Sequence, residues 1–312
     1  VEADEYDKTL LSLKPNMSIV TNIELEHIDC YPTIENLKDT FLTFLNSTPF
    51  FGVNVIYYDD KNIQSIIKDI KRPYIKYGYS SECDVRYYNA KFEGLKSSYD
   101  LIVNGKIVSK INLKVPGEHN ILNSLAAICI ALEMEIPISV IKEGLSRYEG
   151  VKRRFEIKHT IPASSNNNIL VVDDYAHHPS EIAATIQTAK SGWDLNKLII
   201  VFQPHLYSRT KNFYKEFASV LSKSDIVIMT EIFPSREKKI EGVQSELIFN
   251  QLDDTVEAYL LCKTEIAKKV SEICSSNDMI IVMGAGDIRN ITNDIYLETS
   301  NRISLENGLI ND

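Results

Sequence analysis

The chain has 312 residues, of which 44% are hydrophobic and 25% are charged. This composition is typical of globular proteins and excludes a disordered one, and the length favours two packed cores. A formal charge of −9 excludes a protein that binds nucleic acid regardless of its sequence, because such affinity comes mainly from Lys and Arg. Any anionic ligand must therefore be bound by a local cluster.

The five cysteines are scattered and form no C-x-x-C pair. This spacing is typical of a protein in a reducing compartment and favours neither a zinc site nor a disulfide framework, so we interpret all five as structural. No stretch approaches 18 apolar residues, and the N-terminus lacks the pattern of a signal peptide. We expect no membrane insertion and a cytoplasmic location, while the oligomeric state stays open.

The first half of the chain predicts alternating strands and helices. Residues 17–23 are rich in β-branched side chains, and residues 34–45 carry apolar side chains at helical spacing. Residues 84–115 change to short alternating strands, in which Asn104-Gly105 predicts a type I′ hairpin turn. A further helix is expected over residues 121–133. Because the chain begins at Val1, within what resembles the end of a strand, we expect it to be a fragment.

The second half of the chain predicts an open parallel sheet. Short apolar runs at residues 169–172, 198–202, 226–230 and 279–283 are separated by amphipathic helical stretches, as in buried parallel strands. The chain turns basic just after residue 149, so we place a domain boundary near residue 150. The two expected domains are residues 1–150 and 151–312.

A polar cluster follows each of these four strands, at residues 174–178, 203–209, 231–237 and 284–287. The carboxyl ends of parallel strands meet at one sheet edge, so the four clusters should form one site. In the first cluster, Asp174, Tyr175 and His177 are the better candidates for ligand contact. A metal ion is not expected there, because successive residues of a turn rarely point at one ion.

Two basic groups in this half suit an anionic ligand. His205 and Arg209 follow a strand, and the planar guanidinium fits a carboxylate or a phosphate. Arg153-Arg154 either contacts a ligand or forms a charge pair at the domain boundary. Gly284-Ala285-Gly286 is interpreted as a tight turn, because Arg289 occupies the third glycine position of a dinucleotide-binding motif.

In the first half, residues 21–29 place His27 and several carboxylates just beyond a strand. If the strand that ends near Glu2 is a neighbour, Glu2 is a plausible Mg²⁺ ligand and His27 a less typical one. The sequence contains no G-x-x-x-x-G-K-[ST] motif. ATP chemistry would therefore lack its phosphate-binding loop within these residues.

Eight sequence blocks taken together resemble the Mur ligase family. They occur in the family's order over almost the whole chain: VEADEYD, TNIELEHID, GEHNILNSLAA, VKRRFE, VVDDYAHHPSEI, FQPHLYSRT, IFPSRE and MGAGDI. The DDYAHHP and FQPH blocks favour the members that add L-alanine over the sister ligases and over the ligase that recycles murein tripeptide.

The resemblance implies an α/β fold with two domains. The first is a central ATPase domain with a mostly parallel sheet plus a small antiparallel sheet, truncated before its phosphate-binding loop. The second is a Rossmann-like C-terminal domain. The family's first domain, which holds the UDP-sugar, has no counterpart in the chain.

The resemblance also implies a reaction. ATP phosphorylates the lactyl carboxylate of UDP-N-acetylmuramate, and the amine of L-alanine attacks the acyl phosphate, with Mg²⁺ neutralising charge. By this resemblance, Glu2 and His27 match ligands of the two metal ions, and His119, Asn120 and Asn123 match the residues on the adenine side. Arg154 matches the residue that contacts the ATP phosphates. Asp174, Tyr175 and His177 match the loop that contacts nucleotide and substrate, and His205 and Arg209 match the residues on the amino-acid side.

The sequence departs from the family pattern in two places. Leu206 stands where many relatives carry Arg, so the carboxylate of alanine would rest on Arg209 and on backbone donors. Residues 40–44 contain no lysine, so we predict no carbamylated lysine of the kind used by sister ligases. A non-catalytic module that binds a nucleotide or a partner is the alternative, and the fragment alone is expected to be inactive.

Overall fold

The structure, a computed structural model, describes residues 1–28, 30–163 and 167–306. The chain divides into two compact units, Val1–Glu149 (unit 1) and Gly150–Asp312 (unit 2). Within the described residues each unit is built on one six-stranded sheet. No helix in these residues combines the length and the apolar character needed to cross a membrane.

Unit 1 has a mixed sheet in which the strands follow chain order from β1 to β6. Strands β1 to β4 pair in parallel, and β4, β5 and β6 pair antiparallel. The elements are η1 (Thr9–Ser12), β1 (Met17–Val20), α1 (Ile34–Ser47), β2 (Val53–Tyr57), α2 (Lys61–Ile66), η2 (Ile67–Asp69), β3 (Tyr74–Gly78), β4 (Val85–Glu93), β5 (Lys96–Val103), β6 (Lys106–Leu113), α3 (Glu118–Glu133) and α4 (Ile138–Arg147). The expected antiparallel strands are present, and they continue the parallel sheet through a short β3–β4 ladder.

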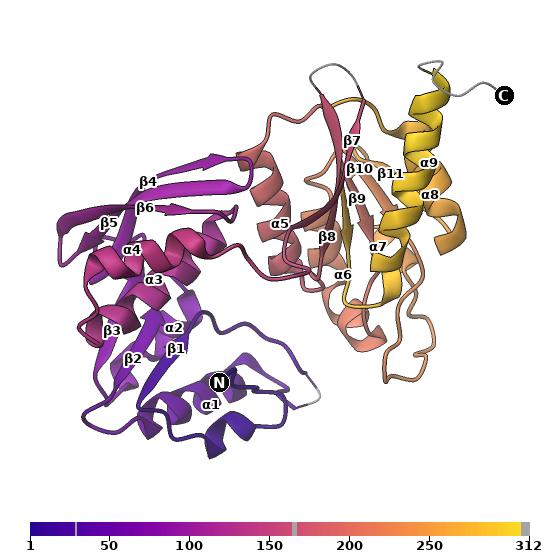
Figure 1. Cartoon of the computed structure of the whole chain (residues 1–312). Helices are drawn as coiled ribbons and strands as arrows, with labels where there is room; N and C mark the ends of the chain where they lie inside the picture. The colour runs from indigo at the N-terminus through magenta and orange to yellow at the C-terminus, as the bar shows by residue number, and fades with distance from the viewer. Residues whose placement is uncertain (29, 164–166, 307–312) are drawn as a thin grey trace. The chain divides into compact units, whose positions relative to one another are not determined.

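Helices cover both faces of this sheet at its centre, around β2. The neighbouring residues Val55 and Ile56 of β2 belong to two different apolar cores, because successive side chains of a strand point to opposite faces. Helices α1 and α2 pack on the face of Ile56, and α3 packs on the face of Val55 (Figure 1). The predicted α/β architecture is confirmed for this unit.

Local sequence signals explain several boundaries in unit 1. The Thr33 side chain accepts a hydrogen bond from the Asn36 amide at 3.3 Å and caps α1. Asn104 and Gly105 have φ values of 48° and 77°, as the predicted type I′ turn requires. Helix α3 begins at Glu118 rather than at residue 121. The apolar pattern starts one turn late because the first turn of this helix is polar.

Unit 2 is the predicted open parallel sheet, with strand order β11-β10-β9-β12-β8-β7. Its elements are β7 (Glu156–Pro162), β8 (Asn168–Asp174), α5 (Pro179–Gly192), β9 (Leu198–Phe202), α6 (Tyr207–Leu221), β10 (Ile226–Met229), α7 (Glu246–Phe249), β11 (Glu257–Leu260), α8 (Lys263–Ile273), β12 (Met279–Met283), η3 (Asp287–Asn290) and α9 (Ile291–Glu306). The edge strand β7, which the apolar pattern did not predict, pairs antiparallel with β8.

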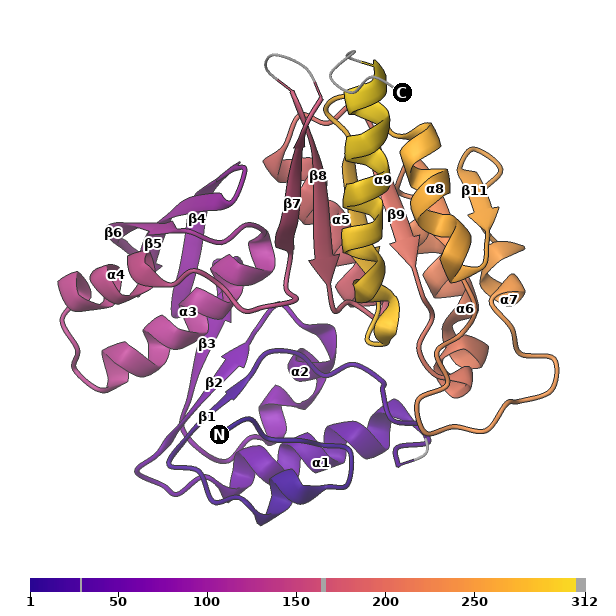
Figure 2. The same ribbon diagram turned by 45° about the vertical axis from the view of Figure 1, so that its right-hand side comes forward.

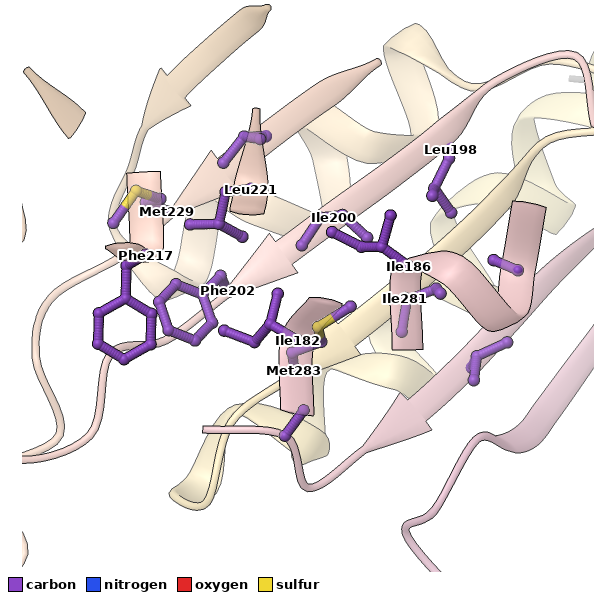
Figure 3. Close-up of a cluster of buried hydrophobic side chains, with 14 of the residues drawn as sticks. Ile182, Ile186, Leu198, Ile200, Phe202, Phe217, Leu221, Met229, Ile281 and Met283 are labelled. Atoms are coloured by element: carbon purple, nitrogen blue, oxygen red, sulfur yellow. The ribbon is translucent and has the colours of Figure 1, made fainter. Parts of the chain in front are cut away.

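Two apolar cores sandwich the sheet of unit 2. Strand β9 is fully buried, and its residues alternate between the cores, with Ile199 on one side and Ile200 on the other. Helices α5 and α6 cover the face of Ile200, where Ile182 and Ile186 of α5 lie against the sheet (Figure 3). Helices α8 and α9 cover the opposite face (Figure 2). This three-layer arrangement is the Rossmann-like fold that the resemblance implied.

Strand β12 lies between β8 and β9 and marks a change of direction. The chain leaves β8 and β9 toward the face of α5 and α6, but it leaves β12 toward η3 and α9 on the other face. Ligands of open α/β sheets bind beyond the carboxyl ends of strands at such a switch point. A ligand site is therefore expected at the loops after these three strands.

Candidate functional site

The predicted polar clusters meet at the carboxyl edge of the unit 2 sheet. The rings of His177, after β8, and His205, after β9, lie edge to face with centroids 5.8 Å apart. His205 forms an isolated parallel β-bridge with Phe233, which follows β10. The Gly284 amide, after β12, donates to the Asp174 carbonyl oxygen at 3.2 Å. Loops from four strands thus form one continuous cluster.

Arg153 ties the start of unit 2 to this cluster. Its Nη2 donates to the Gly284 carbonyl oxygen at 2.8 Å, and its Nε lies 3.5 Å from Oδ2 of the buried Asp173. Its guanidinium carbon also lies 4.5 Å from the centroid of the Tyr175 ring. Arg153 therefore contacts the loops that follow β8 and β12. Arg154, the predicted phosphate contact, has a side chain that is 51% exposed and forms an ion pair with Glu181 at 3.3 Å.

Asp174 is buried and organises the loop after β8. Its Oδ2 accepts a hydrogen bond from the Phe155 amide and its Oδ1 one from the Ala176 amide, both at 2.8 Å. Burial raises the pKa of this carboxyl to about 6, although the two amides and Arg154 oppose the shift. These contacts favour a positioning role for a residue that the sequence analysis predicted to contact nucleotide and substrate.

His177 and Tyr175 line the site beside Asp174. Nδ1 of His177 lies 2.8 Å from the Tyr175 carbonyl oxygen and 3.2 Å from Oε2 of Glu181. Both oxygens accept hydrogen bonds, so Nδ1 carries a proton and Nε2 is the nitrogen at which the ring gains or loses a proton. Burial opposes ionisation of Glu181, but His177 and Arg154 outweigh it and lower the pKa of its carboxyl. The Tyr175 ring packs edge to face on His177 with centroids 5.0 Å apart.

Glu181 does more than cap the start of helix α5. Its Oε2 accepts hydrogen bonds from the amides of His177 at 2.9 Å and His178 at 3.2 Å. One carboxylate therefore caps the helix and fixes both the backbone and the ring of His177.

His205 and Arg209 lie on either side of the start of α6 and form a direct pair. Nη1 of the buried Arg209 lies 3.2 Å from Nδ1 of His205. A guanidinium only donates, so Nδ1 of His205 accepts and its ring proton lies on Nε2. Burial, together with the positive charge of Arg209, lowers the pKa of His205 to about 4. His205 is therefore a neutral donor at physiological pH.

The loop after β10 contributes two groups that the sequence analysis did not single out. The ring of Phe233 stacks on His205 with an interplanar angle of 13°. Glu237 accepts a hydrogen bond from the Ser208 amide at 2.9 Å and another from the Ser208 hydroxyl. Both residues lie in the polar cluster 231–237, and the polar composition of this cluster was the only feature of the sequence that indicated them.

The loop after β12 approaches its neighbours closely. A Cβ atom on Gly286 would lie 2.6 Å from Cγ of Phe233 and 2.7 Å from Oε1 of Gln203, so only glycine fits there. The neighbouring Asp287 pairs with Lys263 at 2.8 Å, and this hydrogen bond lowers the pKa of the carboxyl. The chain bends at residues 285–286 between β12 and η3, where the sequence predicted a tight turn.

Unit 1 holds a separate cluster of possible metal ligands. Ligand atoms of Glu5, Glu26 and His27 all lie within 4.8 Å of one another. The hydrogen bond with His27 lowers the pKa of Glu5. The predicted ligand Glu2 lies outside this cluster on an exposed stretch, and Glu5 was not proposed from the sequence. Two carboxylates and an imidazole suit a divalent cation, with oxygen as the ligand that Mg²⁺ prefers.

The predicted adenine-side residues lie at the start of α3. The side-chain amide of Asn120 donates to the Pro116 carbonyl oxygen at 2.7 Å and lies 3.1 Å from Nε2 of His119. Asn123 is exposed one turn further along the helix. These three predicted residues therefore lie together within the first two turns of α3.

The chain matches two family descriptions in succession. Residues 2–131 match the Mur ligase middle domain, and residues 153–286 match the Mur ligase, glutamate ligase domain. The chain is 38% identical over 291 residues to the UDP-N-acetylmuramate--L-alanine ligase of Salinibacter ruber, covering 92% of the chain and 60% of that protein. It is 37% identical over 302 residues to the protein of the same name from Geobacter sp. strain M21, covering 95% of the chain and 64% of that protein.

Solved structures give the same result for the fold. The UDP-N-acetylmuramate-alanine ligase MurC of Thermotoga maritima superposes with a TM-score of 0.75 at 26% identity, over 96% of this chain and 63% of that one. A murein peptide ligase of Psychrobacter arcticus, at 20% identity and a TM-score of 0.63, covers 94% of this chain and 59% of that one and shows the shared fold alone. The chain spans about three-fifths of the length of the curated relatives, from 60% to 64% in these two cases. With the middle and C-terminal domains both matched in order, the chain belongs to the Mur ligase family.

Proposed function

We propose that the protein containing this chain is an ATP-dependent ligase that joins L-alanine to the lactyl carboxylate of UDP-N-acetylmuramate, in the cytoplasm, for peptidoglycan synthesis. The single observation that carries this proposal is the His205–Arg209 pair beside His177. It supplies a guanidinium and a neutral N–H donor for a small carboxylate. The relatives that are 37% to 38% identical to the chain carry the name of this activity.

The His205–Arg209 pair receives the amino acid in this proposal. Arg209 binds the carboxylate of alanine, because its planar fork matches two carboxylate oxygens. His205 donates from Nε2, since its Nδ1 is occupied by Arg209. In this tautomer His205 cannot act as a base toward the incoming amine, so it serves as a donor to the alanine carboxylate or to the developing oxyanion.

His177 is the complementary group in this proposal. Its Nδ1 proton is directed at the Tyr175 carbonyl oxygen and Glu181, which leaves Nε2 as the basic nitrogen. It accepts the proton that the alanine amine loses as the amine attacks the acyl phosphate. The expelled phosphate leaves with the electrons of the broken acyl C–O bond. Tyr175 packs against His177 and holds its ring in place.

In this proposal the metal and adenine groups belong to unit 1. Arg154 of unit 2 is a predicted contact of the ATP phosphates, while Asp174 positions the loop after β8 through the amides of Phe155 and Ala176. Glu5, Glu26 and His27 hold a magnesium ion, and Glu2 stays the predicted ligand of a second one. Bound Mg²⁺ would offset the negative charge of phosphate and carboxylate. His119, Asn120 and Asn123 stay the predicted contacts of the adenine side. Because the sequence has no phosphate-binding loop motif, the 312 residues alone should bind ATP weakly and give no turnover.

The test is an assay of ADP release by the full-length protein with UDP-N-acetylmuramate and ATP. L-Alanine should support turnover, and L-serine or glycine should serve as comparison substrates. The 312-residue chain under the same conditions is the matched control, and it should be inactive. A full-length protein that requires D-glutamate or a tripeptide instead would refute the proposal. Turnover by the 312 residues alone would show that the reaction does not need a phosphate-binding loop of the G-x-x-x-x-G-K-[ST] kind.

A further inference from the structure

Helix α6, which carries Arg209, begins without a capping side chain of its own. The residue before it is Leu206, which has no hydrogen-bond acceptor in its side chain and adopts a φ of 72°. L-residues rarely adopt such a conformation, so this start of the helix is strained. Exposed N–H groups at a helix start need an acceptor.

Glu237 supplies that acceptor from a distant part of the chain. Its Oε2 accepts from the Ser208 amide at 2.9 Å, and its Oε1 accepts from the Ser208 hydroxyl. Ser208 is the second residue of α6, where a carboxylate is also favoured by the helix dipole. Glu237 lies 29 positions further along the sequence, so the loop after β10 caps a helix that follows β9.

This loop is held against the site at more than one point. The Phe233 amide donates to the Pro204 carbonyl oxygen at 2.8 Å, and the Leu206 amide donates to the Phe233 carbonyl oxygen at 3.0 Å. The Glu237 amide closes a turn by donating to the Pro234 carbonyl oxygen at 2.9 Å. The loop after β10 therefore contacts the chain on both sides of Leu206, the strained residue between His205 and α6.

The position of the first turn of α6 determines the position of the Arg209 side chain. Arg209 follows Ser208 directly, and it donates to His205, which lies just before the helix. A shift of the Ser208 backbone therefore moves the guanidinium relative to the imidazole. We propose that Glu237 is a positioning residue for the amino-acid end of the site: by capping α6 through Ser208, it fixes the Arg209–His205 pair. This inference rests on the proposed function.

The main test is the Glu237→Gln variant of the full-length protein. The amide keeps the size of the side chain but removes its charge, and its nitrogen can only donate, so the Ser208 amide and hydroxyl can no longer both donate to this side chain. The KM for L-alanine should rise roughly 5- to 30-fold, as the loss of a cap and a charged hydrogen bond implies, while the KM values for ATP and UDP-N-acetylmuramate stay unchanged. Glu241→Gln is the matched control, because Glu241 is exposed in the same loop and its loss changes the net charge equally.

A second variant and a second measurement separate this inference from the proposed function. Ser208→Ala removes one of the two groups that Glu237 binds, so it should raise the KM for L-alanine by less than Glu237→Gln. The double variant should be no worse than Glu237→Gln alone, because both act through one contact. In the 312-residue chain, amide hydrogen exchange at Ser208 should accelerate in Glu237→Gln, whatever the substrate is.

The outcomes are distinguishable. Failure of the wild-type protein to use L-alanine would refute the proposed function, while faster exchange at Ser208 would still support the cap. An unchanged KM for L-alanine, an equal rise in the KM for ATP, or additive effects of the two substitutions would each overturn the positioning role. If Glu237→Gln does not fold, Ser208→Ala with its selective rise in the KM for L-alanine decides the question.

Discussion

Arg209 donates a hydrogen bond from Nη1 to Nδ1 of His205 at 3.2 Å, and this contact fixes both the charge and the tautomer of the imidazole. The groups facing His205 are Arg209, His177 and Arg236, which lower its pKa, and Glu237, which raises it. Burial is the largest influence and also lowers the pKa. The predictions about the amino-acid end of the site follow from this arrangement.

Replacing Arg209 by Met should raise the pKa of His205 from about 4 toward its ordinary value of 6.5, because a nearby positive charge is removed. A titration of the 312-residue chain followed by NMR of the histidine ring measures this shift. Arg236→Met is the matched control and should raise the pKa less, since Arg236 lowers the pKa of His205 less than Arg209 does. In the full-length protein, Arg209→Met should raise the KM for L-alanine roughly 10- to 100-fold, as expected for a lost charged hydrogen bond. An unchanged pKa would contradict the geometry.

His205 and Asp174 should make opposite contributions to the pH dependence of stability. The pKa of His205 falls from 6.5 to about 4 on folding, so its contribution is present above pH 6.5 and is lost as pH falls through 4. The pKa of Asp174 rises from 3.8 to about 6, so its contribution is present below pH 3.8 and is lost as pH rises through 6.

The His205→Gln variant separates the two contributions. As the pH increases from 5 to 7.5, the neutral imidazole of His205 should increase the free energy of unfolding of unit 2 in the wild type. The variant lacks this increase, so its free energy of unfolding should rise less, or fall more, over the same range. Urea unfolding followed by the fluorescence of Trp193, the only tryptophan of the chain, measures this. Identical pH slopes in the two proteins would show that the imidazole is not perturbed on folding.

Strands could be predicted from the sequence where both of their faces are buried. Strands β9 and β12 were predicted to the residue, because all five residues of each strand are apolar and lie between two cores. Strand β7 was missed, because it lies at the sheet edge and carries polar residues such as Glu156 and Lys158. Helix α3 was predicted to start late for the same reason, since its first turn is polar.

The site could be predicted only as far as sheet topology determines it. The meeting of His177 and His205 follows from the parallel order of the strands, which the apolar runs predicted. The contact of Glu237 with Ser208 depends on a loop whose path has no periodic pattern, so no spacing in the sequence indicates it. Likewise, the first five residues form coil, and nothing in their pattern says that Glu5 rather than Glu2 approaches His27.

Replacing Gly286 by Ala should destabilise unit 2 by about 1–3 kcal/mol, as overpacking of a tight interior does. The new Cβ would lie 2.6 Å from the Phe233 ring, and the backbone φ of −84° itself allows alanine, so the effect is purely steric. Gly144→Ala is the matched control: nothing lies within 4 Å of its added Cβ, and the site is in helix α4. That variant should be more stable by about 0.5–1 kcal/mol. Thermal unfolding followed by circular dichroism compares the two, and a destabilised Gly144→Ala protein or a neutral Gly286→Ala protein would contradict this account.

Replacing Glu5 by Gln should weaken the binding of a divalent cation to unit 1 by about 10-fold or more, because one of two carboxylates is lost from a site that prefers oxygen ligands. Isothermal titration of the 312-residue chain with Mn²⁺, a probe for Mg²⁺, measures the affinity. Glu24→Gln is the matched control, since Glu24 is an exposed carboxylate of the same segment and does not belong to the cluster of Glu5, Glu26 and His27. Glu2→Gln distinguishes the ligand predicted from the sequence from the cluster found in the structure. If Glu2→Gln abolishes binding while Glu5→Gln leaves it intact, the cluster of Glu5, Glu26 and His27 is not the metal site, and the carboxylate of Glu5 serves only to hold His27.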